Sequence, residues 1–167
     1  MHDVSIQPLT PQSPWREQMA AGQFAYWGPL TGHGSQALYE TFLQEAAHSS
    51  TLPRVLVATS ADTLLGSVNL MVAEMTIRPH FTPWLGQLFV DKRHRTNGVG
   101  TRLLDAAISY VKGLGHDRLF LFTSGSLPAY YRRRGWVDVE DVALSRQAKN
   151  HPALRQRSLS QRQQCFQ

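Results

Sequence analysis

Apolar residues follow two spacings along this chain, and each spacing predicts one kind of element. Alternating or contiguous apolar residues predict strands at residues 4–7, 54–59, 64–72, 85–90 and 119–122, with one or two more at 136–144. Apolar residues three or four positions apart predict helices at residues 15–27, after Ser35, at 99–111 and at 127–134. The stripe at 99–111 is the most regular, and Gly113 and Gly115 are expected to end that helix.

The order of these elements predicts a mixed sheet. A polar turn after residue 59 joins two strands, which makes an antiparallel hairpin. The strand at 85–90, the long helix and the strand at 119–122 form a βαβ unit, whose right-handed crossover makes the two strands parallel. The predicted fold class is therefore α/β, a central mixed sheet flanked by helices, in one domain over residues 1–145.

Charge is distributed unevenly along the chain. The 167 residues contain 17 Lys and Arg against 12 Asp and Glu, a net charge of +5. Five of the cations and none of the acids follow residue 145, so residues 1–145 carry no net charge. Residues 146–167 are rich in Gln, Arg and Ser, and they are expected to form a flexible basic tail. A neutral body makes nucleic acid an unexpected partner for the domain.

Other features limit the location and the cofactors that we expect. A single cysteine, Cys165, excludes an internal disulfide, and the N-terminus lacks the pattern of a secretory signal. No apolar run approaches the ~18 residues that cross a bilayer, so a cytoplasmic protein without a membrane partner is expected. His80, His94 and His116 lack the spacing of metal ligands, and no metal is expected.

The loop before the long helix carries the clearest chemical signal. Residues 95–100 (RTNGVG) put two glycines at a helix start, where unpaired backbone N–H groups and the helix dipole attract anions. Lys92, Arg93 and Arg95 add positive charge. The loop is neither a Walker motif nor the three-glycine dinucleotide motif. A pyrophosphate cradle is one interpretation, and a solvated surface loop is the other.

A second motif, residues 130–136 (YYRRRGW), by itself fits a core aromatic followed by a basic helix face. Together, LGQLFVDKRHRTNGVGTRLLDAA and LFLFTSGSLPAYYRRRGW resemble the GCN5-related N-acetyltransferases, including a subgroup of small bacterial members. That family shares an Arg/Gln-x-x-Gly-x-Gly/Ala loop and a downstream Tyr-x-x-x-Gly-Phe/Trp. The resemblance spans residues 52–142. It implies a splayed pair of parallel strands and transfer of the acetyl group of acetyl-CoA to a primary amine, by direct attack in a ternary complex.

The resemblance also implies roles for single residues. Backbone N–H groups of the loop would hold the pyrophosphate of acetyl-CoA, at Arg95, Thr96, Asn97, Gly98, Val99 and Gly100. The preceding strand would offer its backbone to the pantetheine arm, at Leu88, Phe89 and Val90. Tyr131 matches the usual general acid, and Ser124 stands near the arm where many members have asparagine. Thr96 replaces a glycine of many members, which makes the affinity of the loop less predictable than its chemistry.

The general base is less well defined. Glu74, near the end of an earlier strand, is the candidate base and would act through a water, although the sequence by itself favours a solvent-exposed strand end. His80 and Asp91 are weaker candidates, and Gln87 cannot usefully accept a proton.

The acceptor stays open between a small amine, an aminoglycoside-like polyamine and a peptide amine. Four aromatic residues either line the acceptor side or simply pack: Trp15, Trp27, Phe81 and Trp84. A homodimer is one option for the oligomeric state. The competing function is a non-catalytic module on the same fold that binds acyl-CoA or nucleic acid, for which Arg132–Arg134 and the tail would supply charge.

Overall fold

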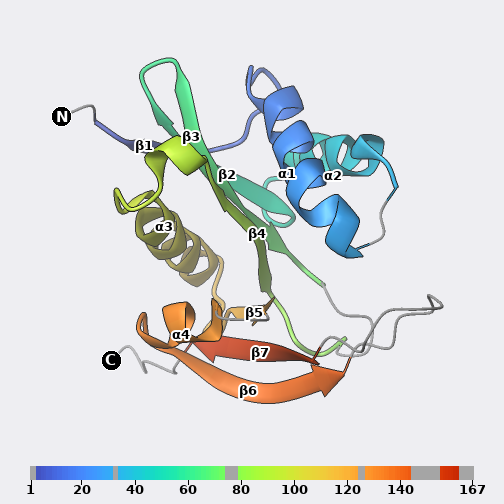
Figure 1. Cartoon of the computed structure of the whole chain (residues 1–167), viewed down its shortest axis with the longest axis vertical. Coiled ribbons are helices and arrows are strands. Elements are labelled where there is room, and N and C mark those ends of the chain that lie inside the picture. The colour runs from blue at the N-terminus through green and yellow to red at the C-terminus, as the bar shows by residue number, and fades with distance from the viewer. Residues whose placement is uncertain (1–2, 32–33, 74–78, 124–126, 144–154, 162–167) are drawn as a thin grey trace.

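The computed structural model describes residues 3–31, 34–73, 79–123, 127–143 and 155–161. Within them lies one seven-stranded sheet with the strand order β1-β2-β3-β4-β5-β7-β6 (Figure 1). The strands are β1 (Ser5–Pro8), β2 (Arg54–Ser60), β3 (Thr63–Met71), β4 (Trp84–Val90), β5 (Phe120–Thr123), β6 (Trp136–Ala143) and β7 (Arg155–Gln161). The pair β4–β5 is parallel and the other pairs are antiparallel, so the predicted mixed sheet is confirmed.

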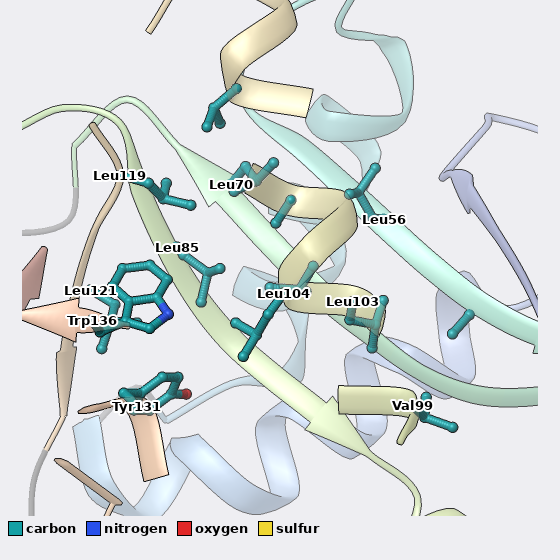
Figure 2. Packing of buried hydrophobic residues seen from close by; sticks show 14 of the residues in the cluster. Leu56, Leu70, Leu85, Val99, Leu103, Leu104, Leu119, Leu121, Tyr131 and Trp136 are labelled. Carbon is teal, nitrogen blue, oxygen red and sulfur yellow. The ribbon is translucent and has the colours of Figure 1, made fainter. Parts of the chain in front are cut away.

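Helices cover both faces of the sheet. On one face, α1 (Arg16–Thr31) and α2 (Gln36–His48) pack over β2 and β3 through a cluster that includes Met19, Leu43 and Val55. On the other face, α3 (Val99–Gly113) and α4 (Leu127–Arg132) share a second cluster with the strands. Figure 2 shows Leu103 and Leu104 of α3 in that second cluster. The predicted apolar stripes therefore do face a sheet, where burial of each large side chain contributes roughly 1.5–3 kcal/mol.

Strands β3 and β4 approach each other unusually closely at one point. A Cβ atom at Gly66 would lie 2.4 Å from the Phe89 carbonyl oxygen, so only glycine fits there. Beyond this point the register between the two strands shifts, from Ser67 opposite Phe89 to Asn69 opposite Gly86. Gln87 lies in the shifted segment with a φ of 43°, a conformation that few side-chain-bearing residues adopt. The result is a bulge in β4, and a bulge bends its strand.

The bend separates β4 from its parallel neighbour. The two strands pair at Trp84 and Phe120. After that pair, among the described residues, β4 has no further ladder partner on its β5 side. This is the splayed pair of parallel strands that the resemblance implies.

One helix end and one strand differ from the predictions. The first helix does not stop at Gly28 and Pro29 but continues to Thr31, although a proline inside a helix removes one intrahelical hydrogen bond and crowds the preceding turn. The expected domain boundary at residue 145 stays a prediction, but β7 (Arg155–Gln161), which follows it, lies in the sheet between β5 and β6. Its polar sequence has no apolar alternation, so the pattern on which strand prediction depends was absent. Residues 146–154 and 162–167 of the expected tail lie outside the described part of the chain.

Candidate active site

A cavity of about 800 Å³ opens where β4 and β5 diverge. Its walls come from both faces of the sheet, because Tyr26 and Trp27 belong to α1 while Tyr130 and Tyr131 belong to α4. The cavity thus passes through the gap in the sheet. Most of the residues expected to bind or react with a ligand line it: Leu88, Phe89, Val90, Arg95, Thr96, Gly98, Val99, Gly100 and Tyr131.

The start of α3 forms one end of this cavity. Gly98 is the N-cap, with a φ of 77°, and no side chain caps the first N–H groups of the helix. Thr96 also has a positive φ, 69°, where many members of the resembling family have glycine. These N–H groups therefore face the cavity without a side-chain partner, which is the arrangement that binds phosphate at helix N-termini.

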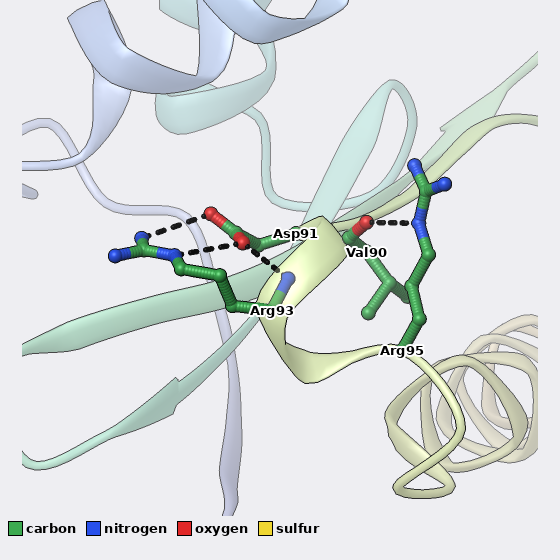
Figure 3. Close-up of polar contacts among 4 residues, drawn as sticks. All are labelled: Val90, Asp91, Arg93 and Arg95. Atoms are coloured by element: carbon green, nitrogen blue, oxygen red, sulfur yellow. Dashed lines mark hydrogen bonds and ion pairs between the residues drawn. The ribbon is translucent and has the colours of Figure 1, made fainter.

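Two arginines near this loop have different roles (Figure 3). Arg95 donates from Nε to the Val90 carbonyl oxygen at 3.0 Å, which ties the loop to the end of β4. Arg93 instead pairs with Asp91, with Nη2 3.1 Å from Oδ2. Hydrogen bonds from the Arg93 side chain and backbone lower the pKa of Asp91 to about 2. The Asp91 side chain accepts from the Arg93 backbone N–H and so caps the short 3-10 helix η1 (Lys92–His94). Its low pKa makes it an unsuitable base.

The cations that reach the cavity are therefore only partly those expected. Lys92 and Arg93 do not line it, whereas Arg95 and Arg134 do. Arg134 follows α4, 3.6 Å above the centroid of the Tyr130 ring, and it donates from Nε to Thr101 Oγ1 at 3.3 Å. The sequence did not indicate that Arg134 lines the cavity, because three consecutive arginines are typical of a solvated helix face. The i, i+4 spacing of Tyr130 and Arg134 was the available signal.

Tyr131 lies deep in the cavity wall, with 8% of its surface exposed. Its ring packs edge-on against Trp136, at a centroid distance of 6.0 Å (Figure 2). It also packs edge-on against Tyr130, at 5.1 Å. Burial is the main reason that the pKa of its phenol rises to about 12, and the neighbouring Tyr130 adds to the rise. The hydroxyl therefore keeps its proton throughout the physiological pH range.

The remaining candidates fall outside this constellation. Asn97 is exposed and does not line the cavity. Glu74 and Ser124 lie outside the described residues, so their expected roles stay predictions. His80 packs edge-on against Phe81, away from the cavity.

The four aromatic residues considered for the acceptor side divide into two groups. Trp27 lines the cavity. The others pack in apolar clusters: Trp15 beside α1 and α2, and Phe81 with Trp84 at the start of β4.

The described residues contain neither a group of metal ligands nor a helix that could cross a membrane. Within those residues, no three His, Cys, Asp or Glu side chains group as metal ligands. None of the described helices combines the length and apolar character of a membrane span.

Comparison with solved structures places the fold among acetyltransferases. A putative GNAT-family acetyltransferase from Desulfovibrio desulfuricans is similar, with a TM-score of 0.71, 18% identity and coverage of 95% of this chain and 98% of that one. A GNAT acetyltransferase from Streptococcus pneumoniae has a TM-score of 0.64, 19% identity and coverage of 95% and 99%. A chain of the NatC complex, solved bound to Gag peptide and CoA, has a TM-score of 0.66, 16% identity and coverage of 95% and 98%.

Sequence comparison identifies the family itself. Among curated proteins no sequence match was found. The profile of the Acetyltransferase (GNAT) family, however, matches residues 20–136, which include β4, the loop before α3, and Tyr131. The chain therefore belongs to the GNAT acetyltransferase family.

Proposed function

We propose that this protein is an N-acetyltransferase that moves the acetyl group of acetyl-CoA to a primary amine, by direct attack in a ternary complex. The observation that carries the proposal is the cavity that passes between β4 and β5. It joins an uncapped helix N-terminus to a buried tyrosine, and it opens toward α1 on the opposite face. These are the parts that a reaction between a phosphate-bearing thioester and a second substrate requires.

The residues present fit acetyl-CoA. A side chain at Gly100 would bring a Cβ atom within 3.2 Å of Tyr130 Oη, so glycine keeps the α3 end of the cavity open. Arg95 and Arg134 would add positive charge beside the pyrophosphate. The backbone of Leu88–Val90, unpaired toward β5, would hydrogen-bond the pantetheine arm as an added strand does. In β5, Thr123 Oγ1 is buried without a partner among the described residues, and it lines the same cavity.

Acetyl-CoA would supply an activated thioester, and Tyr131 would act at the departing sulfur. A thiol like that of cysteine has a pKa near 8.5. Full proton transfer from a phenol with a pKa of about 12 to such a thiolate would be uphill by about 3.5 units, or about 5 kcal/mol. The acid role that we propose is therefore a hydrogen bond donated to sulfur as negative charge develops. A backbone N–H of β4 would stabilise the oxyanion.

On the acceptor side, the amine must lose a proton before or during attack. A lysine-like amine has a pKa near 10.4 and arrives charged, whereas an α-amine near 7.7–8.0 arrives largely neutral. Glu74 acting through a water remains our candidate base.

The direct test combines binding with turnover. Calorimetry with CoA is expected to give a dissociation constant in the micromolar range, about 1–100 μM. Release of free thiol from acetyl-CoA should then depend on the amine, tested with leucinamide, a peptide, spermidine and an aminoglycoside. Absence of CoA binding together with amine-independent thiol release would refute the proposal. A salt-dependent shift with RNA that requires residues 146–167 would favour the binding module instead.

A further inference from the structure

Three side-chain amides form a hydrogen-bonded chain from α1 through β3 to the bulge of β4. Gln23 of α1 donates from Nε2 to Asn69 Oδ1 at 3.1 Å. Asn69 of β3 donates from Nδ2 to Gln87 Oε1, also at 3.1 Å. Gln23 and Asn69 are 1% and 2% exposed, and Gln87 lines the cavity. These hydrogen bonds thus connect the protein interior to the cavity wall.

Apolar side chains at these positions would cost less free energy to bury than amides do. Buried amides are costly unless each finds a partner, and Gln87 in addition adopts a φ of 43°. The residues around Asn69 on its face of the sheet are apolar, Val55 opposite it and Val57 beside it. Strained, polar and hydrogen-bonded groups of this kind concentrate where a ligand needs a fixed donor or acceptor.

The three hydrogen-bonded amides lie on the α1 face of the sheet, and α3 lies on the other face. Asn69 pairs with Val55, whose side chain packs among α1 and α2 residues. A ligand with phosphates at α3 and a thioester between β4 and β5 would leave the α1 side of the cavity to the second substrate. Tyr26 and Trp27, one turn beyond Gln23 on α1, line that side.

The hydrogen bonds also fix which atom of Gln87 remains for a ligand. Because Asn69 donates to Oε1, the Nε2 group and its two N–H donors stay available to the cavity. A donor at this place pairs with an oxygen, such as a carbonyl, and does not pair with an ammonium group.

We propose that Gln87 binds the acceptor amine by donating from Nε2 to an oxygen next to the reacting nitrogen, and that Asn69 and Gln23 are its positioning residues. The acceptor class is therefore α-amino acyl compounds, such as amino-acid amides and peptide N-termini. The inference rests on the proposed acetyltransferase function and adds the chemical class of its acceptor.

The test uses two acceptors that differ by one group, leucinamide and 3-methylbutylamine. Because their amine pKa values differ, each variant is compared with wild type on the same acceptor at one pH. Gln87→Met removes the amide at similar volume and should raise the KM for leucinamide by about tenfold or more, since the acceptor oxygen loses its donor. The KM for 3-methylbutylamine and the affinity for CoA should change by less than about twofold.

Gln87→Glu tests the direction of the hydrogen bond. The carboxylate still accepts from Asn69 Nδ2 but presents an oxygen in place of Nε2. It should raise the KM for leucinamide at least as much as Gln87→Met does. A lower KM than wild type would mean that residue 87 accepts from the amine, which overturns the proposal.

Asn69→Asp tests the positioning role. The carboxylate that this substitution introduces can only accept when ionised, so Gln87 would turn its Nε2 toward it and present Oε1 to the cavity. The variant should raise the KM for leucinamide as Gln87→Glu does, with the affinity for CoA unchanged. Asn69→Leu should instead change the KM values for leucinamide and 3-methylbutylamine by more similar factors.

Failure of the acceptor assignment and failure of the proposed acetyltransferase function would give different results. If wild type binds CoA and acetylates amines, but the Gln87 variants change both acceptors equally or neither, the acceptor assignment is wrong and the acetyltransferase function stands. If no amine increases thiol release by wild type, the proposed function itself fails.

Discussion

At the scale of single residues, burial decides the chemistry of Tyr131. The same wall of aromatic rings that excludes water from its phenol raises the pKa to about 12. The hydroxyl therefore keeps its proton, and can donate a hydrogen bond, across the physiological pH range. A solvated tyrosine would lose that property near pH 10.

Replacing Tyr131 by Phe should separate chemistry from binding. We expect kcat to fall about 100-fold, because losing one hydrogen bond to the charge that develops in the transition state costs on that order, while the dissociation constant for CoA changes by less than about twofold. Steady-state kinetics and calorimetry measure the two quantities. Tyr39→Phe is the matched control, since Tyr39 is also 8% exposed but belongs to α2 and packs in the cluster between α1, α2 and the sheet, and it does not line the cavity. Equal kcat values for wild type and Tyr131→Phe would remove Tyr131 from the acid role.

Asp91 predicts a change of stability with pH. Its folded-state pKa of about 2 lies below the ordinary value of 3.8, so its ionised form stabilises the fold above about pH 4 and this contribution is lost as the pH falls toward 2. Because the pair with Arg93 is solvent-accessible, we expect Asp91→Asn to lower the free energy of unfolding by only about 0.5–1 kcal/mol at pH 7.

Urea unfolding from pH 7 down to pH 3 measures that difference. It should shrink as the pH falls below 4. Asp105→Asn on α3 removes one negative charge elsewhere and serves as the control. A wild-type advantage that grows at acid pH would contradict the assignment.

At the scale of elements, the start of α3 lines the cavity and the rest of the helix packs on the sheet. Its stripe of buried residues fixes the helix on the sheet, while its first turn is left uncapped and faces the cavity. Two glycines at opposite ends of α3 allow the roles to be separated. A Cβ atom at Gly100 would lie 3.2 Å from Tyr130 Oη, whereas a Cβ atom at Gly113 would have no atom within 4 Å.

Gly100→Ala should weaken CoA binding about tenfold, which corresponds to about 1.4 kcal/mol, because its methyl group narrows the α3 end of the cavity. Gly113→Ala should leave the affinity unchanged and stabilise the helix by a few tenths of a kcal/mol, up to about 1. Calorimetry and thermal unfolding distinguish the two. Equal CoA affinities in both variants would show that the start of α3 does not hold the ligand.

At the scale of the whole molecule, the sheet depends on a strand from near the end of the chain. β7 pairs with β5 on one side and with β6 on the other. Removing it would leave β5 with an unpaired edge next to the cavity and would detach β6 from the sheet. The stretch expected to be a tail is thus part of the support for Tyr131, whose helix α4 connects β5 to β6.

Truncation tests this dependence. A variant that ends at residue 145 should lose about 3–5 kcal/mol of its free energy of unfolding, or fail to fold, because the ladder hydrogen bonds to two neighbouring strands are lost together. A variant that ends at residue 161 keeps β7 and should unfold within about 1 kcal/mol of the full chain. Urea titrations followed by circular dichroism measure both. Equal stability of the 145-residue variant would show that β7 contributes nothing to the sheet.

Local sequence determined the elements whose signal is local. The apolar stripe of α3, the hairpin of β2 and β3, the glycines before α3 and the placement of Tyr131 could all be predicted, because periodicity and motif spacing depend on near neighbours. The crossover rule then made β4 and β5 parallel.

Tertiary structure alone decided what depends on residues distant in sequence. Gln23, Asn69 and Gln87 are separated by 46 and 18 positions, and no pattern along the chain links them. The same is true of β7, whose polar sequence becomes a strand only because β5 and β6 offer hydrogen-bonding edges on both sides. The sequence by itself thus determined the glycine-containing loop at the start of α3 and the position of Tyr131, and packing determined the cavity wall on the α1 side.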